Sequence, residues 1–376
     1  MTQFKDRIRA AGGKVDFLYD PLRGIASQIS GFSFVAVYMV AVSMTGRELL
    51  ATVPAVGIGQ VAVYPKPSVI TYIQSDEQGM WGRNCPTCEK YFRTTHVGGA
   101  TFCPYCSVFA DGLAFTSKDQ RTYITAYCDA FMRAYLGKTN SVLDMAEITD
   151  DVPAWHYSEE KLQSHFVCSN EHCGAETDIL GDYGYCPRCG QTNARKLFPD
   201  RMNGAIERLE KLKLNTTDRR EREDNWERML VSSLSELEAV AKHLRAKLLL
   251  FPLTTNRRKR LAELNFQKPT EADTQLRQWF DIGLLEWVGN AEVSRRALVE
   301  TDLHFVKKAI QKRHILIHNG GVVDQEYLDL SEDNQARLGE KIRVRSAEAR
   351  RFIEVCRNMG MNLMDNVEIG FAEGRS

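Results

Sequence analysis

The sequence lacks an excess of charge of either sign. Lys plus Arg and Asp plus Glu each number 49 among 376 residues, so the formal net charge is zero. This balance excludes a global positive field of the kind that attracts nucleic acid, so any such contact must come from local basic patches. The chain is longer than one ordinary domain and 43% of its residues are hydrophobic. We therefore expect two or three domains with sizeable cores.

The sequence also has little that could cross a membrane. The apolar run "FSFVAVYMVAVSM", Phe32 to Met44, is shorter than the roughly 20 apolar residues that a membrane helix needs. A charged stretch precedes it and small residues follow, as in a signal peptide, but the run starts too late for a typical one. We interpret it as a buried strand or core helix, with membrane or targeting use as the alternative, and expect no membrane partner.

The cysteines lack the distribution of a disulfide framework, because eight of the ten fall into four tight pairs. Two such pairs give four thiolates that close a tetrahedron around one metal ion, with no open position for water. We therefore predict two structural Zn²⁺ ions and a reducing compartment, the cytoplasm. Reduced core cysteines and an iron-sulfur cluster are the alternatives. The predicted ligands are Cys85, Cys88, Cys103 and Cys106 for the first ion, and Cys168, Cys173, Cys186 and Cys189 for the second.

Both clusters resemble zinc ribbons, which either bind nucleic acid or protein through a hairpin or only stabilise a small domain. Several aromatic and basic side chains near the cysteines could stack on bases. They are Tyr91, Phe92, Arg93 and His96 in the first cluster, and Tyr183, Tyr185 and Arg188 in the second. Cys128 and Cys356 lie outside the clusters and are interpreted as buried apolar residues.

The N-terminal half shows mixed patterns. Residues 60–74, rich in β-branched and aromatic side chains, predict two short strands joined by a turn. A capping box at Ser117 and Gln120 opens a helix that Gly137 ends. We divide the chain into a mixed α/β region (1–80), a first ribbon (81–115), a helix with connector (116–158), a second ribbon (159–197) and a helical domain (200–376).

Glycine and proline become scarce after Asp200, and apolar residues recur at helical spacing. The basic run "NRRKR", Asn256 to Arg260, is placed in the loop after the first long helix, as a solvated turn or a phosphate contact. The predicted fold class is multidomain α+β, with a C-terminal all-α helical bundle. Its expected helices span Asn225 to Leu249, Glu271 to Ile282, Asp302 to His318, and Ala347 to about Asp365.

The third of these helices ends in "QKRHILIHNGG", Gln311 to Gly321. Thr301 or Asp302 is the expected cap, and Asn319-Gly320-Gly321 is the expected C-terminal stop. At about 100° per residue, a polar stripe runs beside the apolar face, and Arg313 lies on the other flank of that face. The expected core face holds Leu303, Val306, Ile310 and Ile317, and the polar stripe holds His304, Lys307, Gln311, His314 and His318.

This helix lacks the glutamate that a zinc metalloprotease helix carries next to its first histidine. Ile315 stands in that position, and the sequence offers no third ligand nearby. Because catalytic zinc sites normally have three protein ligands, we do not expect a catalytic metal here.

Arg313, His314, three apolar residues and His318 resemble the defining motif of the HEPN superfamily. These helical domains of prokaryotic defence and toxin-antitoxin systems commonly act as metal-independent ribonucleases. The following "NGGVVDQEYL", with Asp324 and Tyr327, is similar to one bacterial branch of the family. The resemblance covers about Asp200 to Asp365. It implies an endoribonuclease that needs no catalytic cofactor, RNA as substrate, a homodimer through the C-terminal domain, and an antitoxin or defence-system protein as partner.

Metal-free RNA cleavage needs a base for the 2′-hydroxyl, an acid for the leaving 5′-oxygen and a cation for the phosphorane. We predict His318 as proton shuttle, Arg313 as phosphate clamp and His314 as orienting residue. Lys307, Asn319 and His304 are weaker candidates for substrate binding. Two hypotheses compete with this one: a non-catalytic binding protein whose helical bundle only dimerises, and a zinc hydrolase.

Overall fold

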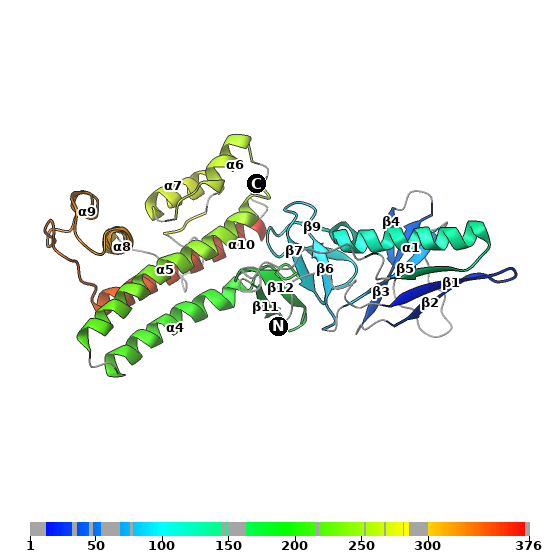
Figure 1. The fold of residues 1–376 in the computed structure, drawn as a ribbon. Coiled ribbons are helices and arrows are strands. Elements are labelled where there is room, and N and C mark those ends of the chain that lie inside the picture. Colours follow the sequence, from blue (N-terminus) through cyan, green and yellow to red (C-terminus); the bar gives the residue numbers. More distant parts are fainter. Residues whose placement is uncertain are drawn as a thin grey trace. The chain divides into compact units, whose positions relative to one another are not determined.

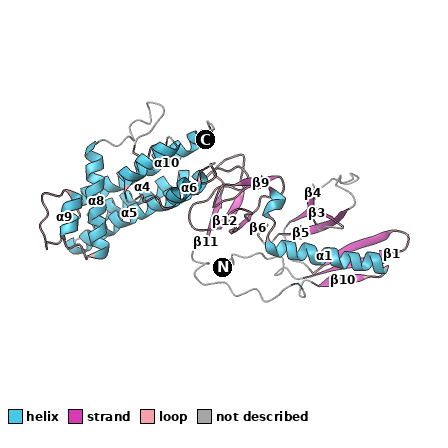
Figure 2. Cartoon of the chain, turned by 90° about the horizontal axis from the view of Figure 1, so that it is seen from above, coloured by secondary structure: helices cyan, strands magenta, loops and turns pink. Residues whose placement is uncertain are grey.

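The chain folds into two compact units, Met1–Asn193 and Ala194–Ser376 (Figure 1). The first consists mainly of strands and the second of helices (Figure 2). The computed structural model describes residues 13–31, 36–44, 48–53, 68–75, 78–144, 148, 163–215, 218–251, 253–266, 268–280, 282–285 and 300–372. None of the helices within these ranges has the length and apolarity to span a bilayer.

Two small antiparallel sheets belong to the first unit. One has the order β10-β1-β2 and the other β4-β3-β5. The apolar run that we interpreted as a strand or core helix is strand β3 over its described central part. Of the two strands predicted within 60–74, the second is β5, and the first lies outside the described residues. The bounds are β1 Lys14–Asp20, β2 Gly24–Ser30, β3 Val37–Ser43, β4 Leu49–Val53, β5 Ser68–Gln74 and β10 Ser141–Asp144.

Helix α1, Lys118–Gly137, packs against strands of both sheets. Its predicted capping box is confirmed, since the Ser117 hydroxyl accepts a bond from the Gln120 amide and the Gln120 side chain accepts one from the Ser117 amide. Apolar side chains of α1 and both sheets form one buried core, in which Phe17 meets Tyr127 edge-on with ring centroids 4.9 Å apart.

The two cysteine clusters share a single sheet of order β11-β12-β7-β6. Strand β12 of the second cluster pairs with β7 of the first, with Thr177 opposite Thr94 and Asp178 opposite Arg93. A separate hairpin, β8-β9, precedes a short 3-10 helix at Gly112–Phe115. The bounds are β6 Trp81–Asn84, β7 Tyr91–Thr94, β8 Ala100–Phe102, β9 Phe109–Asp111, β11 Gln163–Val167 and β12 Glu176–Leu180.

Helices α4, α5 and α10 lie side by side in the second unit (Figures 1 and 2). Leucines of α5 are fully buried at helical spacing, as predicted, and α10 approaches α4 closely at Gly360. A Cβ at Gly360 would lie 2.4 Å from the ring of Phe198, so this contact needs glycine. The bounds are α4 Ala194–Asn215, α5 Arg219–Leu248, α6 Thr255–Ala262, α7 Pro269–Phe280, α8 Glu300–His318, α9 Gln325–Ser331 and α10 Ser346–Ala372.

Several sequence predictions need correction here. The run "NRRKR" lies within helix α6, which Thr254 caps, and not in a loop. Helix α8 already includes Thr301 and Asp302, so neither residue is its cap. Helix α5 begins at Arg219 behind the cap Asp218, and α10 continues to Ala372. Helices α4 and α9 were not predicted.

Candidate functional site

The first cysteine cluster has the geometry of a four-thiolate metal centre. The Sγ atoms of Cys85 and Cys106 are 3.6 Å apart, and those of Cys88 and Cys103 are 3.7 Å apart. A tetrahedron with zinc-sulfur bonds of about 2.3 Å has edges of about 3.8 Å, so the four sulfurs fit one ion.

The second cluster repeats this arrangement. Cys168 and Cys189 have Sγ atoms 3.4 Å apart, and the corresponding distance for Cys173 and Cys186 is 3.5 Å. The ligand atoms within each cluster all lie within 4.8 Å of one another. The longer spacing of the first cysteine pair, with four intervening residues, is therefore accommodated without opening the site. Both clusters could hold a metal ion.

A left-handed residue follows the second cysteine of every pair: Glu89 with φ 59°, Ser107 with φ 59°, Gly174 with φ 60° and Gly190 with φ 73°. In the first pair, this turn lets the Cys85 amide donate to the Lys90 carbonyl at 3.1 Å. The amides of Thr87 and Cys88 both lie 3.4 Å from the Cys85 Sγ. Such N–H to sulfur contacts stabilise thiolates, so the backbone is arranged for metal-bound sulfur.

The shared sheet buries an ion pair between the clusters. Arg93 on β7 pairs with Asp178 on β12, and their side chains are only 1% and 4% exposed. The other carboxylate oxygen of Asp178 is 2.7 Å from Nδ1 of the half-exposed His165. Because a buried charge needs a partner, this pair ties one metal cluster to the other.

Burial corrects the prediction of base stacking for four of the seven side chains named beside the cysteines, whereas Tyr91 and His96 are half-buried. Phe92, Arg93, Tyr183 and Tyr185 are all buried. Arg188 is exposed but donates from its guanidinium to the Cys173 carbonyl at 2.8 Å. These side chains stabilise the two clusters, and the four buried ones present no stacking surface.

The predicted catalytic residues lie at the C-terminal end of α8. The helix stops at His318 as predicted, and Gly320 and Gly321 both adopt left-handed backbone, with φ 58° and 80°. The amides of Asn319 and Gly321 each donate to the Ile315 carbonyl at 2.9 Å. The glycine pair thus closes the helix and leaves His318 on its exposed last turn.

The three motif side chains differ in their surroundings. His314 and His318 are exposed, and their rings lie 4.7 Å apart between centroids. Arg313 is half-buried, and its Nε is buried without a hydrogen-bond partner in the described part of the chain. No carboxylate among the described residues forms an ion pair with Arg313, so its charge is available to an anion.

Ile317 does not belong to the core, contrary to the sequence prediction. Val306 and Ile310 on the same face are buried, but Ile317 is 45% exposed. At about 100° per residue, Ile317 lies roughly 40° around the helix from Arg313. His314 and His318 lie about 100° and 140° from Arg313 in the same direction. The apolar face of α8 thus leaves the core in the last turn, where it separates the arginine from the histidines.

The weaker substrate-binding candidates already have partners within the chain. Lys307 forms an ion pair with Glu332, and His304 Nδ1 lies 3.5 Å from the same carboxylate. The side-chain amide of Asn319 donates to the Val322 carbonyl at 2.8 Å, so this side chain belongs to the turn. All three side chains therefore contribute to local structure. The sequence spacing did not predict that Glu332 would be the partner of Lys307 and His304.

The side of α8 that faces away from Ile317 carries a polar network that the sequence analysis did not find. Asp333, which follows α9, accepts from the Tyr327 hydroxyl at 2.9 Å and pairs with Lys308 at 2.7 Å. Lys312 pairs with Glu348 of α10 at 2.6 Å. The only sequence signal was the separation of Lys308 and Lys312 by four residues, which puts both on one helix face.

Comparison of the chain with protein-family models, curated proteins and solved structures gives no significant match.

Proposed function

We propose that the protein is a metal-independent endoribonuclease of the HEPN type. The observation that carries the proposal is the last two turns of α8, where the half-buried Arg313 and the exposed His314 and His318 occupy one arc around the exposed Ile317. The C-terminal unit would be a HEPN-like bundle with RNA as substrate. The resemblance of the motif supports this assignment, and the helical fold of the second unit is consistent with it.

The proposed reaction is attack of a 2′-hydroxyl on the adjacent phosphorus, with loss of the 5′-oxygen. His318 would accept the 2′-proton, and a proton returned to the 5′-oxygen completes a 2′,3′-cyclic phosphate and a 5′-hydroxyl. Arg313 would bind the phosphorane oxygens through its guanidinium. The 4.7 Å ring separation lets His314 orient substrate next to His318.

One copy of α8 does not bring these groups together, because Arg313 and His318 are about 140° apart around the helix. A two-fold dimer across the arc of α8 that holds Arg313, Ile317 and His318 would place Arg313 of one copy near His318 of the other. Ile317, 45% exposed between them, supplies an apolar centre for such an interface. We therefore propose a homodimer with a composite site.

The N-terminal unit would serve as a recognition or sensing module with two structural Zn²⁺ ions. Four-thiolate sites are typical of Zn²⁺ and supply no open position for chemistry. Eight reduced cysteines fit a cytoplasmic protein. A role in antiviral defence or toxin-like growth arrest, with an antitoxin as partner, follows from the HEPN resemblance.

The test is cleavage of a labelled RNA by the full-length protein in excess EDTA, with zinc content measured before and after. We expect two retained zinc ions per chain, cutting by the unmodified protein, and a cyclic phosphate end. Arg313→Ala and His318→Ala should each reduce the rate at least 100-fold, the order of magnitude contributed by one acid-base or charge-stabilising group.

The matched control is Arg337→Ala, which removes an exposed arginine of the same unit outside the motif. Its rate should stay within twofold of the unmodified protein. Equal rates in all variants, or no cleavage by any of them, would refute the nuclease assignment. Loss of cleavage in EDTA with both zinc ions retained and the fold intact would favour a hydrolase with a further, chelatable metal ion instead.

A further inference from the structure

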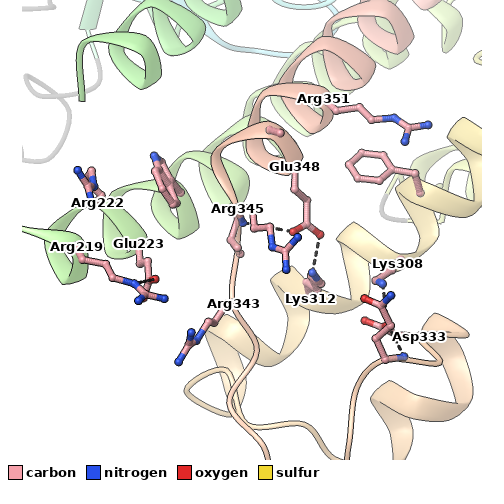
Figure 3. Close-up of a pocket in the computed structure, with 15 residues that line it drawn as sticks. Arg219, Arg222, Glu223, Lys308, Lys312, Asp333, Arg343, Arg345, Glu348 and Arg351 are labelled. Atoms are coloured by element: carbon pink, nitrogen blue, oxygen red, sulfur yellow. Dashed lines mark hydrogen bonds and ion pairs between the residues drawn. The ribbon is translucent and has the colours of Figure 1, made fainter. Parts of the chain in front are cut away.

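The second unit contains a cavity of about 760 Å³ that the proposed reaction does not use (Figure 3). Its walls come from the start of α5, the middle of α8, Asp333 and Gln335 after α9, and the first turns of α10 with the segment before it. This volume lies within the range of small-ligand sites, which is about 300–1,000 Å³.

The cavity concentrates positive charge in a chain that has none overall. Seven arginines and lysines line it against three carboxylates, which leaves an excess of four positive charges. Each carboxylate already neutralises one cation: Glu223 pairs with Arg219, Asp333 with Lys308, and Glu348 with Lys312. Clustered cations held by one fold repel each other, so an anion that enters the cavity is stabilised.

Of the four cations that remain, Arg351 pairs with Asp302, which does not line the cavity, at 2.8 Å. Arg343 and Arg345 have no such pair. Both are exposed on the segment before α10, and neither has a carboxylate partner within 4.0 Å among the described residues. Figure 3 shows both side chains on the same stretch of chain, between α8 and the start of α5. Two guanidiniums two residues apart offer planar donor groups of the kind that bind phosphate.

Further donors around the cavity lack an acceptor. Helix α10 begins at Ser346, so its first amides have no intrahelical partner, and Ala347 in its first turn lines the cavity.

We propose that this cavity binds a small ligand with two or more linked phosphate groups. Arg343 and Arg345 bind the phosphate oxygens, and the α10 N-terminus donates to them. The site is separate from the motif, since the cavity lining includes none of the three motif residues, and Lys308 and Lys312 project from α8 about 140° and 100° away from Arg313. It therefore adds a ligand site to the proposed nuclease and does not depend on cleavage.

Isothermal titration of the full-length, zinc-loaded protein with inorganic triphosphate tests the site directly. We expect one site per chain, with an affinity that falls steeply as salt rises. The double variant Arg343→Ala/Arg345→Ala should weaken binding at least tenfold. The matched double variant Arg228→Ala/Arg337→Ala removes two exposed arginines that do not line the cavity, and should bind within twofold of the unmodified protein.

Two further titrations distinguish the sources of the phosphates. A nucleoside triphosphate that binds at least tenfold tighter than inorganic triphosphate assigns a nucleotide, and equal affinity assigns the phosphate chain alone. Absence of triphosphate binding at millimolar concentration, or equal weakening in both double variants with native circular dichroism, would overturn the proposal. It would also be overturned if a short RNA without terminal phosphates displaced triphosphate, since the cavity would then contact an RNA backbone.

Discussion

His243 lies inside the second unit, where only 8% of its surface is exposed. Burial, with a smaller contribution from the positive charge of Lys247, lowers its pKa from 6.5 to about 3. The folded protein therefore holds this imidazole neutral, whereas the unfolded chain takes up a proton below its ordinary pKa.

The pH dependence of stability follows from this difference. The stabilisation is complete above about pH 6.5 and is lost as pH falls toward 3, because only the unfolded chain binds the proton in this window. Between pH 6.5 and 4.5 the loss is about 2 kcal/mol. Urea unfolding at both pH values should show a smaller loss for His243→Leu than for the unmodified protein. The exposed His304→Gln should keep the full pH dependence, and an unchanged dependence in His243→Leu would contradict the account.

Single residues also show what the sequence could not reveal. The sequence showed the spacing of Arg313, His314 and His318, but helical periodicity wrongly placed Ile317 in the core. Periodicity carries no information on where the neighbouring elements end. Arg93 was predicted as a side chain that could stack on bases. Its burial was not foreseen, because its partner Asp178 lies 85 residues away in the sequence. A buried ion pair between distant strands has no local signature.

Strand pairing between the two metal clusters is the main feature at the scale of elements. The Arg93–Asp178 pair lies on the two strands that join the clusters, β7 and β12, and excludes water almost completely. Removing one charge leaves the other buried and uncompensated, which typically costs about 3–5 kcal/mol.

Asp178→Asn should therefore destabilise the first unit by about 3–5 kcal/mol in urea unfolding and speed the release of zinc to a chelator. The control is Asp144→Asn, whose partner Lys14 is 3.0 Å away on the surface, with side chains 28% and 58% exposed. This exposed pair contributes about 1 kcal/mol or less. Similar unfolding midpoints for the two variants would show that the buried pair does not hold the clusters together.

Elements differed in how well the sequence predicted them. Capping residues and periodicity predicted α1, the end of α8 and the start of α10, because these signals act within one or two helical turns. Helix α4 escaped prediction because Pro199 and Gly204 interrupt its pattern, although contacts with α5 and α10 hold it. The cysteine spacing predicted both four-cysteine clusters, which could each hold a metal ion, whereas the β7–β12 pairing that unites them is long-range and was not predicted.

At the scale of the whole molecule, the balanced net charge conceals an uneven distribution of positive charge. The chain has no net charge, yet the cavity beside α8 has an excess of four positive charges. The exposed end of the same helix carries the arginine and histidines of the proposed nuclease. Because Arg313 and His318 diverge on one helix, the function proposed here requires two copies of the chain.

A subunit-mixing experiment tests this central claim most directly. Arg313→Ala and His318→Ala chains are mixed in equal amounts after partial denaturation and refolding with zinc, and RNA cleavage is measured in EDTA. A mixed dimer has one composite site with an intact arginine from one chain and an intact histidine from the other. Random pairing should restore about a quarter of the unmodified activity. A mixture that forms mixed dimers but stays as inactive as either variant alone would contradict the composite site.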